Sequence, residues 1–301
     1  MLISIVIPTY NNVKTIEKTI ISCIEQDFDD FEVLAINNNC DDGTDKILEK
    51  YKDKIRIYKN NETVSMYDNH NLGFKYAKGD YIIFCHADDL LFEYSLKVIA
   101  NKLQKRNYPK KYILWGHSYH MDYYINLIKT PFKVNELICG EYNFLPFLYG
   151  GLTPSGTLYH RESMLEVGGF INTLKHRLQP SDWISMLYFA LNDFKFEMID
   201  EILFSKKFDS TYVDLDRKDV MNSIEEAGKA LCNIINQEQV KNLFRGKNLL
   251  KQMPFDFYYA LSYNKTFRNN ILKGMVYFLL KNPLIIKDKY FYILLTRLIN
   301  V

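Results

Sequence analysis

The first 115 residues alternate short runs of β-branched and aromatic residues with stretches of helical spacing. The runs predict strands at residues 2–7, 31–36, 55–58 and 81–85, because each is closed by Pro, Asn, Gly or Asp. Apolar side chains that recur every three or four positions predict helices through Ile16, Ile20, Cys23 and Ile24, and through Leu96, Ile99 and Leu103. Strands that alternate with helices are typical of βαβ units, so we expect an α/β fold with a mostly parallel central sheet flanked by helices.

The pattern changes twice further along the chain. From about residue 111 to 210 it predicts short mixed strands, a glycine- and proline-rich loop at 150–156 and a helix near 182–191. After residue 214 the spacing is helical, with a second helical stretch from about residue 283 onward. We therefore predict one domain at 1–213, with halves at 1–115 and 116–213, followed by a helical C-terminal region at 214–301.

Composition excludes several classes of protein. The chain has 301 residues, of which 48% are hydrophobic and 25% charged, as expected for a globular protein rather than a disordered one. Its net charge of +2 does not favour a nucleic-acid partner. The five cysteines form no CxxC pair, so we expect neither a disulfide framework nor a thiolate zinc site, and a reducing cytoplasm fits them best. We expect no membrane-spanning segment and no signal peptide.

Polar clusters follow three of the predicted strands. They are Pro8-Thr9-Tyr10-Asn11-Asn12, Asn37 to Gly43, and His86-Ala87-Asp88-Asp89. Each cluster could simply end a strand and cap a helix. In an open parallel sheet, however, ligands bind beyond the carboxyl ends of the strands, so three clusters at this edge predict a shared binding site.

The pair Asp88-Asp89 indicates a metal ion in that site. Two adjacent carboxylates after a buried strand repel each other unless a cation lies nearby, and Mg²⁺ or Mn²⁺ takes such ligands together with substrate phosphates. No P-loop and no GxGxxG follows a strand, and neither HExxH nor GxSxG occurs. Metal-assisted handling of a nucleotide is therefore the chemistry that the motifs favour.

These motifs resemble those of the family 2 glycosyltransferases of the GT-A fold. The resemblance is carried in order by the segment Ser4 to Asn11, the Asn-rich turn Ile36 to Thr44, His70-Asn71-Leu72-Gly73, Ala77 to Tyr81, Ala87-Asp88-Asp89, Gly168-Gly169-Phe170 and Ser181-Asp182-Trp183. It covers roughly residues 2–210. It implies that 1–115 binds a nucleotide-diphospho-sugar and that 116–213 binds the acceptor.

The resemblance also implies roles for individual residues. The implied donor contacts are Pro8, Thr9, Tyr10, Asn38, His70 and Asp88, and the implied ligands of Mn²⁺ or Mg²⁺ are Asp89 and Asp88. Asp182 is the implied general base, although it could instead cap a helix. Trp183 and Ser155 are candidates for the acceptor side. Asn37, His70 and His86 depart from the charged residues that are common in the family.

The C-terminal region is basic and aromatic. Residues 251–301 carry eight cations against two acids, interleaved with Phe and Tyr. This mixture suits either the cytoplasmic face of an anionic inner membrane or helices that merely cover the catalytic domain.

Taken together, the residues and the resemblance predict a metal-dependent inverting glycosyltransferase. It would move one sugar, expected to be UDP-linked, to a glycan or lipid-linked glycan acceptor in bacterial surface polysaccharide or lipooligosaccharide synthesis. The alternative is a catalytically silent nucleotide- or sugar-binding protein on the same fold. A sugar nucleotidyltransferase would show a GxGTR-like loop near the start, which this chain lacks.

Overall fold

The structure is a computed structural model, and contacts within the chain divide it into two compact units. It describes residues 1–120, 154–171, 181–206, 217–234, 258–259, 262, 268–287 and 289–299. The first unit comprises residues 1–141, 153–170 and 194–212, and the second comprises 142–152, 171–193 and 213–301. The functional boundary that we expect at residue 213 stays a prediction. The contacts within the chain group residues 171–193 with the C-terminal region.

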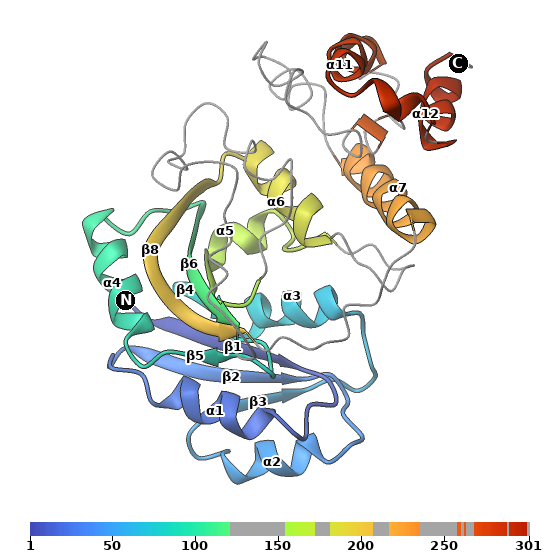
Figure 1. The fold of residues 1–301 in the computed structure, drawn as a ribbon. Coiled ribbons are helices and arrows are strands. Elements are labelled where there is room, and N and C mark those ends of the chain that lie inside the picture. The colour runs from blue at the N-terminus through green and yellow to red at the C-terminus, as the bar shows by residue number, and fades with distance from the viewer. Residues whose placement is uncertain are drawn as a thin grey trace. The chain divides into compact units, whose positions relative to one another are not determined.

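Strands and helices alternate through the first unit, as the hydrophobic pattern predicts (Figure 1). Its strands are β1 (Ile3–Thr9), β2 (Phe31–Asn37), β3 (Arg56–Lys59), β4 (Tyr81–Phe84), β5 (Leu90–Leu91), β6 (Tyr112–His120), β7 (Thr157–His160) and β8 (Lys195–Lys206). Its helices are α1 (Ile16–Ile24), α2 (Thr44–Lys50), α3 (Met66–Tyr76), α4 (Ser95–Lys105) and α5 (Arg161–Glu166).

The strands form one eight-stranded sheet in the order β3-β2-β1-β4-β7-β6-β8-β5. The β1–β2, β1–β4, β2–β3 and β6–β8 pairs are parallel, and β7 and β5 pair with their neighbours in the antiparallel sense. All seven residues of β1 are buried, as expected for a central strand of a parallel sheet that is covered on both faces. Pro8 has no N–H, and β1 tolerates it because its ladder with β4 ends at Val6. The mostly parallel α/β sheet is thus confirmed.

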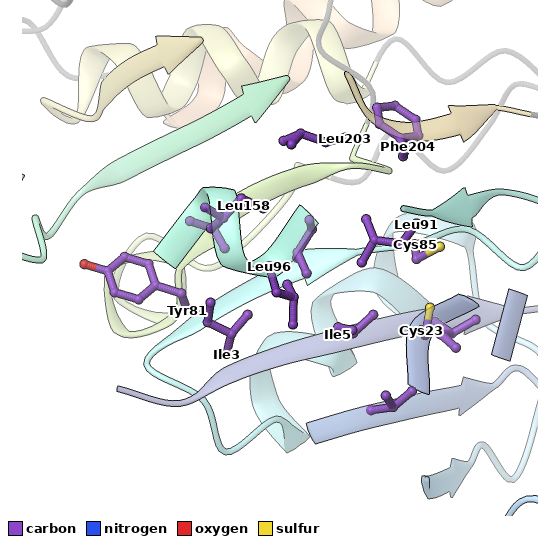
Figure 2. Packing of buried hydrophobic residues seen from close by; sticks show 14 of the residues in the cluster. Ile3, Ile5, Cys23, Tyr81, Cys85, Leu91, Leu96, Leu158, Leu203 and Phe204 are labelled. Atoms are coloured by element: carbon purple, nitrogen blue, oxygen red, sulfur yellow. The ribbon is translucent and has the colours of Figure 1, made fainter. Parts of the chain in front are cut away.

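Each face of the sheet is covered by a different set of helices. On one face Ile3 and Ile5 of β1 share a core with Cys23 of α1 and Leu96 of α4 (Figure 2). On the other face Gly73 of α3 lies against β1. A Cβ at Gly73 would lie only 2.7 Å from Val6 Cγ1, so glycine lets α3 approach the strand closely. This close approach brings the residues of α3 to the carboxyl ends of the strands.

The second unit is helical in its described part. It contains α6 (Ser181–Leu191), α7 (Arg217–Ile234), α11 (Arg268–Lys281), the short 3₁₀ helix η4 (Pro283–Lys287) and α12 (Lys289–Ile299). The helices expected near 182–191, after 214 and from about 283 therefore form. Among the residues described, no helix combines the length and the hydropathy needed to cross a bilayer.

A buried carboxylate fastens α4 to the part of the sheet formed by β6 and β8. Glu197 of β8 is 6% exposed and accepts hydrogen bonds from Arg106 (2.7 and 2.9 Å) and Tyr112, while Lys102 Nζ lies 2.6 Å from it. Burial alone would raise the pKa of the Glu197 carboxyl, but these hydrogen bonds outweigh it and lower the pKa to about 2. The charged form is therefore strongly preferred in the folded state.

We predict that Glu197→Gln lowers the free energy of unfolding at pH 7 by about 1–3 kcal/mol, because an amide cannot neutralise the two cations. A carboxyl whose pKa is lowered on folding stabilises the folded state at pH values above its ordinary pKa of 4.5. The difference in unfolding free energy between the variant and the wild type should therefore shrink below pH 4.5 and disappear near pH 2. Urea unfolding of both proteins at several pH values measures this difference in free energy. Glu162→Gln is the control, because its pair with Lys110 is exposed. Equal losses in the two variants would contradict the prediction.

Candidate functional site

A pocket of about 510 Å³ lies where β1, β2 and β4 end. Residues from four segments of the chain line it. They are Pro8, Thr9, Tyr10 and Asn12 at the end of β1 and just after it; Asn38 after β2; Thr63, Val64, Met66, Asn69 and His70 before α3 and in its first turns; and His86, Ala87 and Asp88 after β4. The predicted donor contacts Pro8, Thr9, Tyr10, Asn38, His70 and Asp88 therefore meet in one pocket. The shared edge of the parallel strands is what brings them together.

The Asn-rich turns after β1 and β2 are tied to each other. Asn11 Nδ2 donates to Asp41 Oδ1 (2.8 Å), and Asn11 Oδ1 accepts from the Asp41 N–H (3.1 Å). Asn37 Oδ1 accepts from the Cys40 N–H (2.9 Å). Asn11 and Asn39 have φ angles of 53° and 56°, in the left-handed region that asparagine tolerates better than most residues. These polar side chains thus hold the turns that follow β1 and β2 in place. The sequence also allows this structural role for the strand-end clusters.

Asn38 lies in the pocket wall, and its side-chain amide makes three hydrogen bonds. Its Nδ2 donates to the Val64 carbonyl (2.9 Å), and its Oδ1 accepts from the Val64 N–H (2.9 Å) and from Asn60 Nδ2 (2.9 Å). Asn60 Nδ2 also donates to Asn69 Oδ1 (2.9 Å). All three asparagines are at least 94% buried. Asn38 therefore holds the segment around Val64 in place as one wall of the pocket.

Tyr10 and Thr9 contribute to the pocket in different ways. The Tyr10 side chain is 52% exposed and presents its ring at the rim, where a planar ligand could stack on it. Thr9 is fully buried, and its hydroxyl donates to the Ile7 carbonyl (3.1 Å). The Thr9 carbonyl accepts from the Asn38 N–H (2.9 Å), which joins the two strand ends.

Two histidines meet in the wall of the pocket. His70 Nε2 lies 3.0 Å from His86 Nε2, and His70 Nδ1 lies 2.7 Å from the Met66 carbonyl oxygen. Burial, together with the nearby His86, lowers the pKa of His70 to about 3. Burial and the charge of Lys206 also lower the pKa of His86. Both rings are therefore neutral near pH 7, and His70 bears no positive charge with which to bind a phosphate.

The two adjacent acids occupy different positions. Asp88 is partly exposed and lines the pocket, whereas Asp89 is 1% exposed and lies behind it, with Oδ2 at 3.9 Å from His86 Nδ1. The Asp88 carboxylate and the His86 imidazole are donor groups suited to a divalent cation that also binds ligand oxygens. Within the described residues no cluster of three or more His, Cys, Asp or Glu forms, so such an ion would need ligands from a substrate or water.

The expected acceptor-side residues are described to different extents. Ser155 is fully buried, and its Oγ accepts the backbone N–H of His86 (3.1 Å), so it supports the strand end after β4. Asp182 and Trp183 lie in the first turn of α6, but their side chains fall outside the described part of the structure. Most of the loop at 150–156 lies outside it as well. The roles expected for these residues stay predictions.

Part of the chain is similar to a known protein family. Residues 4–130 match the family described as "Glycosyl transferase family 2". Residues 4–130 are a family 2 glycosyltransferase domain. One relative is the GalNAc(5)-diNAcBac-PP-undecaprenol beta-1,3-glucosyltransferase of Campylobacter jejuni, which is 32% identical over 104 residues, or 33% of this chain and 34% of that protein. The chain thus covers about a third of the length of this curated relative.

Two solved structures have a similar fold. Residues 1–349 of Staphylococcus aureus TarS in complex with UDP-GlcNAc match with a TM-score of 0.63 at 18% identity, over 90% of this chain and 82% of that one. The mannosyltransferase PcManGT of Pyrobaculum calidifontis, in complex with GDP-Man and Mn²⁺, matches with a TM-score of 0.56 at 15% identity, over 98% of this chain and 83% of that one. The family 2 domain thus has the GT-A fold that the resemblance implies.

Several residues of the pocket could not be found from sequence motifs. Thr63, Val64 and Asn69 line it, and Asn60 supports it, yet none belongs to a recognised strand-end cluster. The signal in the sequence was the polar run that follows residue 58, which lies at the same sheet edge as the clusters after β1 and β2.

We predict that Asn60→Ala destabilises the family 2 domain by about 1–3 kcal/mol, because it removes a buried donor from both Asn38 and Asn69. The loss of support should also expose the Val64 segment to faster amide hydrogen exchange. Asn61→Ala is the matched control, because the neighbouring side chain is exposed. Equal stability and exchange in the two variants would contradict this account of the pocket wall.

Proposed function

We propose that the protein is a metal-dependent inverting glycosyltransferase that uses a nucleotide-diphospho-sugar, with a UDP-sugar as the first candidate. The observation that carries the proposal is the pocket at the ends of β1, β2 and β4, where the ring of Tyr10 and the carboxylate of Asp88 line the same space. An aromatic ring suits a nucleobase, and a carboxylate suits an ion bound to a diphosphate. The UDP-GlcNAc complex of TarS supports a UDP-sugar as donor.

In this proposal each part of the pocket wall has a role in binding the donor. Tyr10 stacks on the base, while Pro8, Thr9 and the Val64 segment held by Asn38 shape the space around it. Asp88, with Asp89 behind it, would hold Mn²⁺ or Mg²⁺ against the diphosphate. When bound, such an ion stabilises the negative charge of the leaving diphosphate. The neutral His70 contributes through its contact with His86 rather than through charge.

The proposed base is Asp182. Its carboxylate accepts the proton of an acceptor hydroxyl as that oxygen forms a bond to the anomeric carbon of the sugar. The bond between the anomeric carbon and the diphosphate oxygen breaks in the same step, and the nucleoside diphosphate leaves with the electron pair. Attack from the face opposite the leaving group inverts the configuration. An acidic residue in the first turn of α6 is compatible with this role, because a helix N-terminus favours a carboxylate.

The acceptor is proposed to be a glycan of bacterial surface polysaccharide or lipooligosaccharide, free or lipid-linked. The support is the name of the Campylobacter relative, which includes an undecaprenol-linked glycan. A silent nucleotide-binding protein with the same fold is the competing outcome of the experiment below.

We predict that the protein releases UDP from a UDP-sugar in the presence of Mn²⁺ and an acceptor, as measured by a coupled UDP assay. Asp182→Asn should lower turnover by at least about a hundredfold, a typical contribution of a general base, and leave UDP binding intact. Asp88→Asn should weaken metal-dependent UDP binding itself. Asp200→Asn, an exposed carboxylate that pairs with His117, is the control. UDP binding without any turnover over a panel of donors and acceptors would favour the silent binder.

We propose in addition that the C-terminal helices contact an anionic membrane surface. Around the junction of α11 and η4, Leu280 and Leu284 are 78% and 72% exposed, and Lys281 and Lys287 are exposed beside them. Residues 268–299 carry six cations and one acid. Exposed leucines next to lysines complement a bilayer whose headgroups are negative, because the apolar chains can enter the interface while the cations meet the lipid phosphates.

We predict that the double variant Leu280→Ser, Leu284→Ser lowers co-sedimentation with vesicles that contain phosphatidylglycerol at least several-fold. Binding to pure phosphatidylcholine should be weak for both proteins. Leu165→Ser, an exposed leucine of the first unit, is the control. Unchanged sedimentation of the double variant would contradict the proposal. Analytical ultracentrifugation gives a second check: if the wild type is a dimer and the same two changes abolish it, the leucines serve self-association and the proposal is contradicted.

A further inference from the structure

The backbone turn that carries Asp88 into the pocket spans residues 86–89 and follows β4 directly. Its first N–H, that of His86, donates to Ser155 Oγ (3.1 Å). The turn closes through a hydrogen bond from the Asp89 N–H to the His86 carbonyl (2.9 Å). Asp88 is the acidic residue of this turn that lines the pocket. The direction of its carboxylate therefore depends on how the backbone of the turn is fixed.

Two threonines hold the same turn through its carbonyl groups. Thr19 of α1 donates from Oγ1 to the Asp89 carbonyl (2.8 Å), and Thr15, at the N-terminal cap of α1, donates from Oγ1 to the Ala87 carbonyl (2.8 Å). Residues four positions apart lie on the same side of a helix, so both hydroxyls reach the turn from one direction. The accepting carbonyls belong to the residues just before and just after Asp88.

The bond made by Thr15 replaces a local one. A threonine at an N-cap usually accepts a hydrogen bond from an N–H of the first helical turn. Within the described part of the chain, the Thr15 side chain accepts no such bond. Its hydroxyl also lies 3.4 Å from the Asn12 carbonyl, but it has one proton, and the contact with Ala87 is shorter. The N-cap residue thus holds a turn 72 positions away rather than its own helix.

Thr19 makes its hydrogen bond in a dry environment. Thr19 is fully buried, and Asp89 is 1% exposed. The Asp89 carbonyl also accepts from Cys85 Sγ at 3.7 Å, but a thiol is a weak donor. The change Thr19→Val keeps nearly the same shape and removes the hydroxyl donor. The carbonyl would lose its short hydrogen bond, and the backbone beside Asp88 would be held less firmly.

We infer that Thr15 and Thr19 are positioning residues that direct the Asp88 carboxylate into the pocket. The inference rests on the proposed function, in which Asp88 acts on the ion that is bound to the diphosphate. A binding group works only when it is held within about 0.5 Å of its productive position, and hydrogen bonds to the backbone on both sides of Asp88 supply that restraint. The two threonines therefore affect ion-dependent nucleotide binding through the backbone of the turn.

The test measures the affinity for UDP by calorimetry, with and without MnCl₂. Thr15→Val and Thr19→Val should each lower the affinity in the presence of Mn²⁺ about tenfold and leave the affinity without Mn²⁺ unchanged. Thr19→Ser keeps the hydroxyl, so it should hold the affinity within about twofold of the wild type, although the lost methyl group lowers the melting temperature. A merely structural role would make affinity and melting temperature fall together.

Ser95→Ala is the matched control. The Ser95 hydroxyl is also fully buried and donates to a backbone carbonyl, that of Leu203. Removing it should lower the melting temperature by about 2–4 °C, as expected for one lost hydrogen bond, without changing the affinity for UDP.

A second readout needs neither metal nor nucleotide. The Asp89 N–H closes the turn, so the exchange of this amide hydrogen reports how firmly the turn is held. Exchange should be several-fold faster in Thr19→Val than in the wild type, and unchanged in Ser95→Ala.

Three results would each overturn the inference. They are an unchanged affinity of Thr19→Val for UDP with Mn²⁺, an equal loss of affinity in Thr19→Ser and Thr19→Val, and an unchanged exchange rate of the Asp89 amide in Thr19→Val. Failure of the wild type to bind UDP with any ion would instead overturn the proposed function. The exchange rate of Asp89 would still decide whether the threonines hold the turn.

Discussion

The parallel pairing of β1 with β2 on one side and with β4 on the other is the constraint on which the pocket depends. Because the three strands run in the same direction, their carboxyl ends meet at one edge of the sheet, and every residue that follows them is delivered to the same place. The close packing of α3 on β1, which Gly73 permits, adds His70 and Asn69 from the other face of the sheet. The pocket is thus a consequence of strand direction and of one close helix contact.

Neutral hydrogen-bonding groups take the place of charges in much of this pocket. The buried amides of Asn38, Asn60 and Asn69 satisfy one another and the backbone of Val64 without any ionised group, so no charge has to be buried in the wall. The same logic applies to the neutral pair His70 and His86. The carboxyl groups at this pocket are those of Asp88, which lines it, and of Asp89 behind it, so the groups suited to a cation lie at one corner.

Strand positions, helix spacing and the strand-end clusters could be read from the sequence, because each depends on residues close together in the chain. The strand predicted at residues 81–85 ends within one residue of β4, and the predicted donor contacts from Pro8 to Asp88 meet in one pocket. Contacts between residues that lie far apart in the chain could not be predicted from the sequence. The hydrogen bonds by which Asn38, a predicted donor contact, holds Val64 join it to a segment that follows a different strand. The hydrogen bond between His70 and His86 joins a helix to a strand end sixteen positions away.

We propose that this pocket binds a nucleoside diphosphate through a divalent ion. Calorimetric titration of UDP, GDP and dTDP into the wild type and into Tyr10→Ala, each with and without Mn²⁺, tests it most directly. We expect one of these nucleotides to bind tightly when Mn²⁺ is present and much more weakly without the ion. Tyr10→Ala should lower the affinity in both conditions. Absence of binding by all three nucleotides, or binding that neither Mn²⁺ nor Tyr10 affects, would contradict it.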